Sequence, residues 1–107
     1  MQMTENDVGG SAVLALDGRL DSVTAPMVEA RLVALLARGP VVADLGAVRY
    51  VSSAGLRVLL KAAKDAKAAG TAFSVCAMQP AVREVFEVSG FDRVIPAFAS
   101  AAEATAG

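Results

Sequence analysis

Short apolar runs alternate along this chain with longer segments in which apolar residues recur every three or four positions. The short runs cover residues 11–17, 41–45 and 71–77, and each one starts directly after a glycine or a proline. Runs of this length next to turn residues are typical of buried strands. We expect residues 1–6 to pair with the first run as an edge strand, and residues 94–95 to form a last short strand.

The longer segments have the periodicity of amphipathic helices. The first is expected to begin near Thr24, whose hydroxyl would cap it, with Pro26 in its first turn and an end at residues 38–40. The second ends at Gly70, and the third begins at Pro80. The residues expected to face the core are Val28, Leu32, Leu35 and Leu36 in the first helix, Leu56, Leu59, Leu60 and Ala63 in the second, and Val82, Val85 and Phe86 in the third.

This order of elements predicts the α/β fold class. Strands that alternate with helices form a mostly parallel sheet, and an initial hairpin adds an antiparallel edge. We therefore expect a mixed sheet of four to five strands with helices packed against it, and a loop over residues 46–50. The 107 residues suffice for one core, so a single domain is expected over residues 1–107, in which the alanine-rich residues 97–107 form one more helix or a frayed tail.

Composition narrows the classes of partner. The 10 basic and 11 acidic residues are scattered and give a net charge of -1, and there is no tryptophan, so a nucleic-acid partner is not expected. The longest uncharged stretch, residues 68–82, is too short and too broken by Gly70 and Pro80 for direct membrane insertion. The single cysteine, Cys76, cannot form an internal disulfide and is expected to be a buried apolar residue in a cytoplasmic protein.

The chain has no histidine, which argues against most catalytic and metal sites. Histidine is the usual general base and a frequent metal ligand, so His-based triads and zinc sites are excluded. Neither of the best-known glycine-rich phosphate-binding loops occurs. Asp44 is expected to accept a local turn hydrogen bond rather than to bind a metal. The sequence predicts a protein that is not an enzyme, with no cofactor and no metal.

The segment Ser52-Ser53-Ala54-Gly55 is the most informative part of the chain. It joins the second apolar run to a helix, so it lies at the carboxyl end of the sheet, where open α/β folds carry their sites. Either serine could simply cap the helix. A cap needs only one serine, however, and Ala54 and Gly55 leave the first turn bare enough for another protein to approach. A phosphate there would add about 1.5 to 2 negative charges over a helix N-terminus that tolerates anions.

Several motifs together resemble the STAS domain of anti-sigma factor antagonists. The resemblance extends from residue 11 to residue 98, and its motifs occur in the order and spacing of that family. The matching stretches are L-D-G-R-L-D at residues 16–21, D-L at 44–45, Y-V-S-S-A-G-L-R-V-L-L at 50–60, Q-P-A-V-R-E-V at 79–85 and S-G-F at 89–91.

This resemblance implies a partner switch. In that family the unphosphorylated antagonist captures an anti-sigma factor, which is also its serine kinase of the histidine-kinase-like ATPase type, and a PP2C-type phosphatase resets the antagonist. The phosphorylated serine of the D-S-[ST]-G-L pattern corresponds to Ser53, with Ser52 as the alternative acceptor. The chain departs from the pattern where Ser52 replaces the aspartate and Ala54 replaces the second hydroxyl residue.

The resemblance and the residues themselves together predict a set of partner contacts. Asp21 is expected to lie near Ser53, although a loop aspartate can equally cap local N–H groups. Arg57 belongs to a basic stripe with Lys61 and Lys64, which is either a partner surface or a solvated helix face. The residues expected to bind the partner are Asp21, Ser52, Ser53, Ala54, Gly55 and Arg57.

Two other functions stay open at this point. The first is an STAS subunit that is never phosphorylated and docks on a transporter or a lipid-trafficking ABC complex, which the missing aspartate before Ser53 favours. The second is a module that binds a small molecule or nucleotide, for which no convergent set of polar residues is present.

Overall fold

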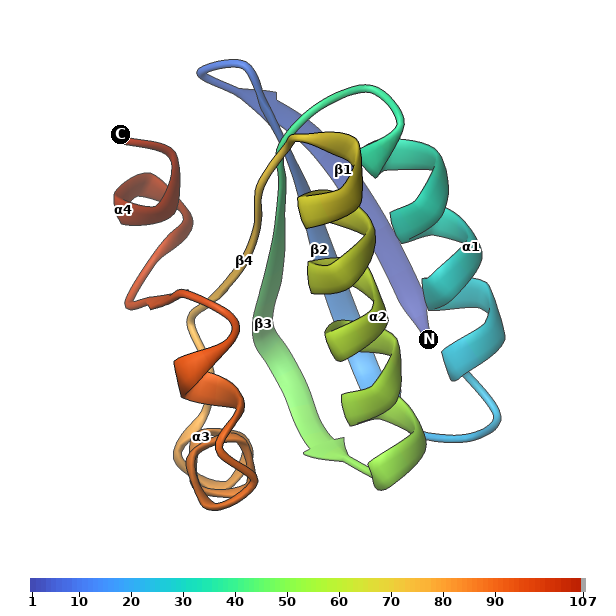
Figure 1. Cartoon of the computed structure of the whole chain (residues 1–107). Helices are drawn as coiled ribbons and strands as arrows, with labels where there is room; N and C mark the ends of the chain where they lie inside the picture. Colours follow the sequence, from blue (N-terminus) through green and yellow to red (C-terminus); the bar gives the residue numbers. More distant parts are fainter. Residues whose placement is uncertain (107) are drawn as a thin grey trace.

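The computed structural model describes residues 1–106 and has a five-stranded sheet at its centre (Figure 1). The strands follow the order β1-β2-β3-β4-β5, in which β1 and β2 form an antiparallel hairpin and the other neighbours are parallel. This arrangement confirms the predicted mixed, mostly parallel sheet. The strands are β1 Gln2–Val8, β2 Ser11–Leu20, β3 Val41–Val51, β4 Phe73–Cys76 and β5 Ala97–Phe98.

Helices cover the two faces of the sheet unequally. In Figure 1, α1 and α2 lie side by side across one face, whereas α4 lies beyond β4 on the other side. None of the helices in the described part of the chain combines the length and hydropathy needed to span a bilayer. The helices are α1 Ala25–Leu36, α2 Ser53–Ala69, α3 Pro80–Val88, the short 3-10 helix η1 Phe91–Arg93, and α4 Ala101–Thr105.

Alternation along the strands sorts the apolar side chains into two clusters. Leu14 and Leu16 of β2 face the main core, into which α1, α2 and α3 also pack, whereas Val13, the residue before Leu14, faces the opposite side. The opposite side holds a smaller cluster around Cys76, which α4 covers. Cys76 is fully buried as expected, and burial raises the pKa of its thiol to about 11. The cysteine therefore stays a neutral, unreactive thiol at neutral pH.

The predicted loop at residues 46–50 is wrong, because β3 continues through it to Val51. The pairing with β2 shifts register twice, between Ala15 and Asp17 and again between Gly18 and Arg19. Each shift inserts an extra residue into β3, which is the signature of a β-bulge. The first bulge turns Val48 into the core in place of Ala47, which plain alternation of the sequence does not predict, and the second bulge brings Val51 back to the core face.

Helix faces were predicted correctly for α1 but not for all of α2 and α3. Leu60 is only half-buried, and the residues of α2 that are buried are Gly55, Val58, Leu59, Ala62 and Ala66. Small residues dominate this face because α2 approaches the sheet closely. A prediction based on the positions of the leucines therefore assigned the wrong face to the core. In α3, Val82 and Phe86 are buried as expected, but Val85 remains 39% exposed.

The predicted strand at residues 94–95 is also wrong. Val94 is exposed, and Ile95 packs into the main core from the turn after η1. The last strand, β5, lies three residues later because the Val75 N–H donates to the Pro96 carbonyl and the Ala77 N–H donates to the Phe98 carbonyl. In the tail, α4 occupies residues 101–105, and Gly107 lies outside the described residues.

Candidate functional site

The carboxyl ends of β2 and β3 and the first turns of α1 and α2 meet at one end of the molecule (Figure 1). Parallel pairing aligns Leu20 with Val51, the last residues of the two strands. The Ser52 N–H donates to the Leu20 carbonyl at 2.9 Å and extends this pairing by one residue. The β2–α1 loop, which starts at Asp21, is thereby held next to the start of α2.

Ser52 is the N-cap of α2. Its backbone is extended, and its Oγ accepts a hydrogen bond from the Gly55 N–H at 3.3 Å. The Ser52 carbonyl accepts the first helical bond, from the Leu56 N–H at 2.9 Å. The side chain is half-buried, so its hydroxyl serves the fold.

Ser53 differs from its neighbour in all these respects. It is the first residue of α2, it is exposed, and its hydroxyl has no hydrogen-bond partner among residues 1–106. A group attached to this hydroxyl would stand at the positive end of the α2 dipole. The geometry thus leaves Ser53 as the serine that is free for chemistry.

Gly55 is not a bare surface for a partner, contrary to the expectation from sequence. It is buried, and a Cβ atom built on it would lie 2.6 Å from the Leu20 carbonyl oxygen and 2.8 Å from Leu20 Cγ. The missing side chain makes room for the backbone of the same chain. Ala54, by contrast, is half-buried and can be reached from outside.

Asp21 organises the loop between β2 and α1. Its Oδ1 accepts hydrogen bonds from the Val23 N–H at 3.0 Å and the Thr24 N–H at 3.2 Å. The Thr24 N–H, helped by that of Val23, holds the pKa of the Asp21 carboxyl below its usual value. Asp21 therefore has the loop-capping role, and its contact with a partner stays a prediction.

The predicted hydroxyl cap at Thr24 is wrong. Thr24 occupies the N-cap position of α1, but its backbone is helical and its side chain makes no cap hydrogen bond. Its Oγ1 instead donates to the Arg19 carbonyl at 2.7 Å and accepts from the Asp21 N–H at 3.0 Å. The hydroxyl thus ties the two ends of the loop together, and the loop geometry depends on Asp21 and Thr24 jointly.

The lowered pKa of Asp21 predicts a pH dependence of stability. The ionised carboxylate is favoured in the folded state, so its contribution is present above the ordinary pKa of 3.8 and is lost as the pH falls below that value. We expect Asp21→Asn to lower the urea midpoint at about pH 7 and to have less effect near pH 3. Asp92→Asn, at an exposed aspartate with no side-chain hydrogen bond in the described chain, is the control. Equal losses for D21N at both pH values would contradict the assignment.

Arg19 and Tyr50 form a cluster beside this loop that sequence reasoning missed. The Arg19 guanidinium lies 4.2 Å from the centroid of the Tyr50 ring, and Arg19 Nε lies 3.6 Å from Asp21 Oδ2. Val23 is 82% exposed in the same loop, and Tyr50 is 43% exposed at the end of β3. A solvent-facing valine and tyrosine near a free serine hydroxyl form the kind of surface that proteins recognise.

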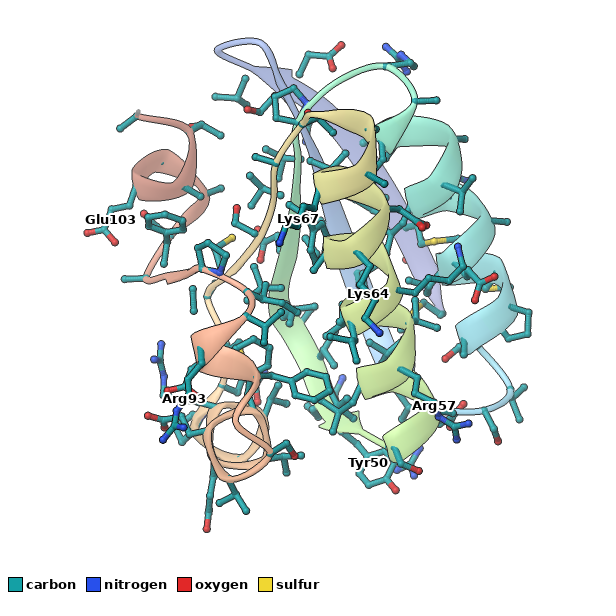
Figure 2. The ribbon with its side chains drawn as sticks, viewed as in Figure 1. Tyr50, Arg57, Lys64, Lys67, Arg93 and Glu103 are labelled. Atoms are coloured by element: carbon teal, nitrogen blue, oxygen red, sulfur yellow. The ribbon has the colours of Figure 1, made fainter. Side chains whose placement is uncertain are left out.

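The basic stripe on α2 starts close to Ser53. Arg57 is exposed one turn further along α2, and Figure 2 shows it at the same end of the molecule as Tyr50. Lys61 donates to Asp65 Oδ2 at 2.7 Å, which raises the pKa of its ammonium group, so this lysine already has a partner. Arg57 and Lys64 form no ion pair within residues 1–106. These two cations are available to another molecule.

Residues 2–104 match the family model of the STAS domain. The chain belongs to the STAS domain family. This STAS domain is 41% identical over 98 residues to a protein of Bordetella bronchiseptica provisionally named as the anti-sigma factor antagonist BtrV, and the match covers 90% of this chain and 84% of BtrV.

Solved structures support the same fold. An anti-sigma factor antagonist from Mycobacterium paratuberculosis is 29% identical and superposes with a TM-score of 0.88, covering 98% of this STAS domain and 91% of that chain. The Bacillus cell fate determinant SpoIIAA in its phosphorylated form, at 19% identity, covers 96% of each chain with a TM-score of 0.73 and shows similarity of fold.

The STAS fold brings the predicted site residues to one end of the sheet, where all but one of them are at least partly accessible. Ser53 and Arg57 are exposed there, Ser52 and Ala54 are half-buried, and Asp21 lies in the adjoining loop. Gly55 is buried and shapes the site from within. The position of Arg19 and Tyr50 depends on the shifted register of β3, which sequence periodicity does not reveal.

Proposed function

We propose that this STAS domain is an anti-sigma factor antagonist that is switched by phosphorylation of Ser53. The observation that carries the proposal is that the two serines have different environments. The Ser52 hydroxyl caps α2, whereas the Ser53 hydroxyl is exposed and forms no hydrogen bond within the described chain. The name of BtrV, which is 41% identical, supports the same function. SpoIIAA, the more distant fold relative, has been solved in a phosphorylated form.

The proposed switch acts through surface charge. In the unphosphorylated state, the antagonist binds an anti-sigma factor that is also a serine kinase of the histidine-kinase-like ATPase type, in the cytoplasm. Phosphorylation of Ser53 adds about 1.5 to 2 negative charges at the N-terminus of α2, where the helix dipole tolerates them. The fold survives, the docking surface changes sign, and the anti-sigma factor is released. A PP2C-type phosphatase then restores the hydroxyl.

The surroundings of Ser53 suit a docking surface. Val23 and Tyr50 supply exposed apolar area, and the Arg19 guanidinium stacked on Tyr50 supplies charge at its edge. Aromatic and arginine side chains contribute most of the binding energy at protein interfaces. The antagonist itself transfers no group in this scheme, since the kinase and the phosphatase carry out both chemical steps.

Phosphorylation of the purified protein tests the proposal. The anti-sigma factor kinase of the native host is incubated with the protein and ATP, and the phosphate is located by mass spectrometry. We expect one phosphate on Ser53, none on Ser53→Ala, and an unchanged level on Ser52→Ala in the fraction that remains folded. A protein that stays unmodified and instead co-purifies with a membrane ATPase would refute the proposal and favour an STAS subunit of a transporter or lipid-trafficking complex.

A further inference from the structure

A groove runs between α1 and α2 and begins beside Ser53. Its volume is about 710 Å³, and the residue after Ser53, Ala54, forms part of its lining. Both helices start at the same end of the sheet, so the groove opens next to the β2–α1 loop and continues along α2 (Figure 1). The groove is therefore continuous with the surface at which we propose that the partner docks.

The lining of the groove is positively charged. Arg57, Lys61 and Lys64 oppose a single acidic residue, Glu29 of α1, which gives the lining a net charge of +2. The whole chain has a net charge of -1, so this excess of positive charge is local. Lys61 already forms an ion pair with Asp65, and the negative charge of Glu29 also helps to raise the pKa of Lys61. The two uncompensated cations are Arg57 and Lys64, which Figure 2 shows at successive levels along α2.

The rest of the lining is mostly small and apolar. Ala25 and Ala30 of α1 face Ala54, Val58 and Leu60 of α2 across the groove. Short side chains on both helices leave the space between them unfilled, and Leu60 is half-buried there instead of in the core. An apolar groove with cations along one wall fits an amphipathic segment with carboxylates at its edge.

We propose that this groove binds an acidic amphipathic segment of the partner protein, with apolar side chains on Ala30 and Leu60 and carboxylates at Arg57 and Lys64. This inference rests on the proposed function, which identifies the partner as an anti-sigma factor. It adds the chemical character of the segment that the partner inserts into the groove.

Phosphorylation of Ser53 would act on this groove in two ways. The phosphate would stand within a Debye length of the groove and repel an acidic segment. Arg57 follows Ser53 by four residues on the same helix, a spacing that brings two side chains together. Arg57 would therefore pair with the phosphate and would no longer be available to bind the acidic segment. One modification would thus remove the attraction and add a repulsion.

Peptide binding followed by NMR tests the groove without the natural partner. The probe is a synthetic helical peptide with leucine and alanine on one face and glutamate on the other, added to the ¹⁵N-labelled full chain at low salt. The matched probe has lysine in place of each glutamate. We expect the acidic peptide to shift the amide signals of Glu29, Arg57, Val58 and Lys64, and the basic peptide to leave them unchanged.

Charge reversal at two positions gives the decisive comparison. The variant Arg57→Glu/Lys64→Glu is expected to lower the affinity for the acidic peptide roughly tenfold, because each exposed ion pair raises the affinity by a factor of up to about five. The control Lys67→Glu/Arg83→Glu makes the same change in net charge at exposed residues outside the groove, and Lys67 projects from α2 on the side away from α1 (Figure 2). Arg57→Gln/Lys64→Gln replaces the first variant if that one does not fold.

The outcomes separate the inference from the proposed function. Absence of shifts in the groove at millimolar acidic peptide, or equal weakening by the control variant, overturns the inference even if Ser53 is phosphorylated. Binding of the acidic peptide in the groove, together with an unmodified Ser53 in the kinase assay, supports the groove and refutes the switch.

Discussion

Replacing Ser53 by aspartate is expected to weaken the complex with the anti-sigma factor by roughly a hundredfold, which corresponds to about 2.8 kcal/mol. The reason is that the exposed Ser53 hydroxyl becomes part of the interface in the proposed complex, where a fixed carboxylate would be desolvated without a partner. Ser53→Ala removes only the hydroxyl and is expected to bind like the wild type. Isothermal titration calorimetry of the purified pair measures both.

The matched control for the Ser53 substitution is Ser89→Asp. Ser89 is an exposed serine at the carboxyl end of α3, far along the chain from the proposed docking surface, and its replacement makes the same change in net charge. We expect its affinity to equal that of the wild type. Equal affinities for S53D and S89D would show that Ser53 lies outside the interface.

Replacing Gly55 by alanine is expected to destabilise the fold by about 2 kcal/mol. A methyl group there would lie 2.6 Å from the Leu20 carbonyl oxygen, and because that atom belongs to the backbone of a buried strand end, it cannot move aside freely. Overpacking of this kind costs about 1 to 3 kcal/mol, and the better helix propensity of alanine offsets at most about 1 kcal/mol of it. Urea denaturation measures the net effect.

Two comparisons make the Gly55 result specific. Ser53→Ala changes an exposed residue of the same helical turn and is expected to alter stability by less than about 0.5 kcal/mol. Gly55→Ala should also weaken anti-sigma factor binding, because relief of the clash displaces the first turn of α2 together with Ser53. A G55A protein as stable as the wild type would contradict the close packing of α2 on Leu20.

Local patterns were sufficient to predict most of the fold. The apolar runs identified the first three parallel strands, and the face of α1 followed from its periodicity because α1 packs on the sheet through large aliphatic residues. The continuation of β3 could not be predicted in this way, since two bulges break the alternation on which strand recognition depends. Leu60 and Ile95 were misplaced because their environments depend on neighbours that are distant in sequence.

The site shows the same division between local and distant information. Sequence alone identified the serine pair but could not assign the cap, because that assignment depends on which residue has the extended backbone, and the structure gives it to Ser52. The pairing of Arg19 with Tyr50 lies beyond sequence reasoning for a different reason. The contact depends on how many bulges β3 contains where it pairs with β2. The paired residues of these two strands are more than twenty positions apart in the sequence.

The two contacts of the Leu20 carbonyl have a consequence for how the proposed switch would work. It accepts the backbone N–H of the residue before Ser53 and also presses against Gly55, so the serine stands on a platform that the sheet holds on both sides. Because the first turn of α2 is held against the sheet in this way, we do not expect a change at Ser53 to be transmitted by movement of the helix. In the proposed switch, a phosphate on Ser53 would therefore act through its local charge, and it could be added and removed repeatedly without refolding of the domain.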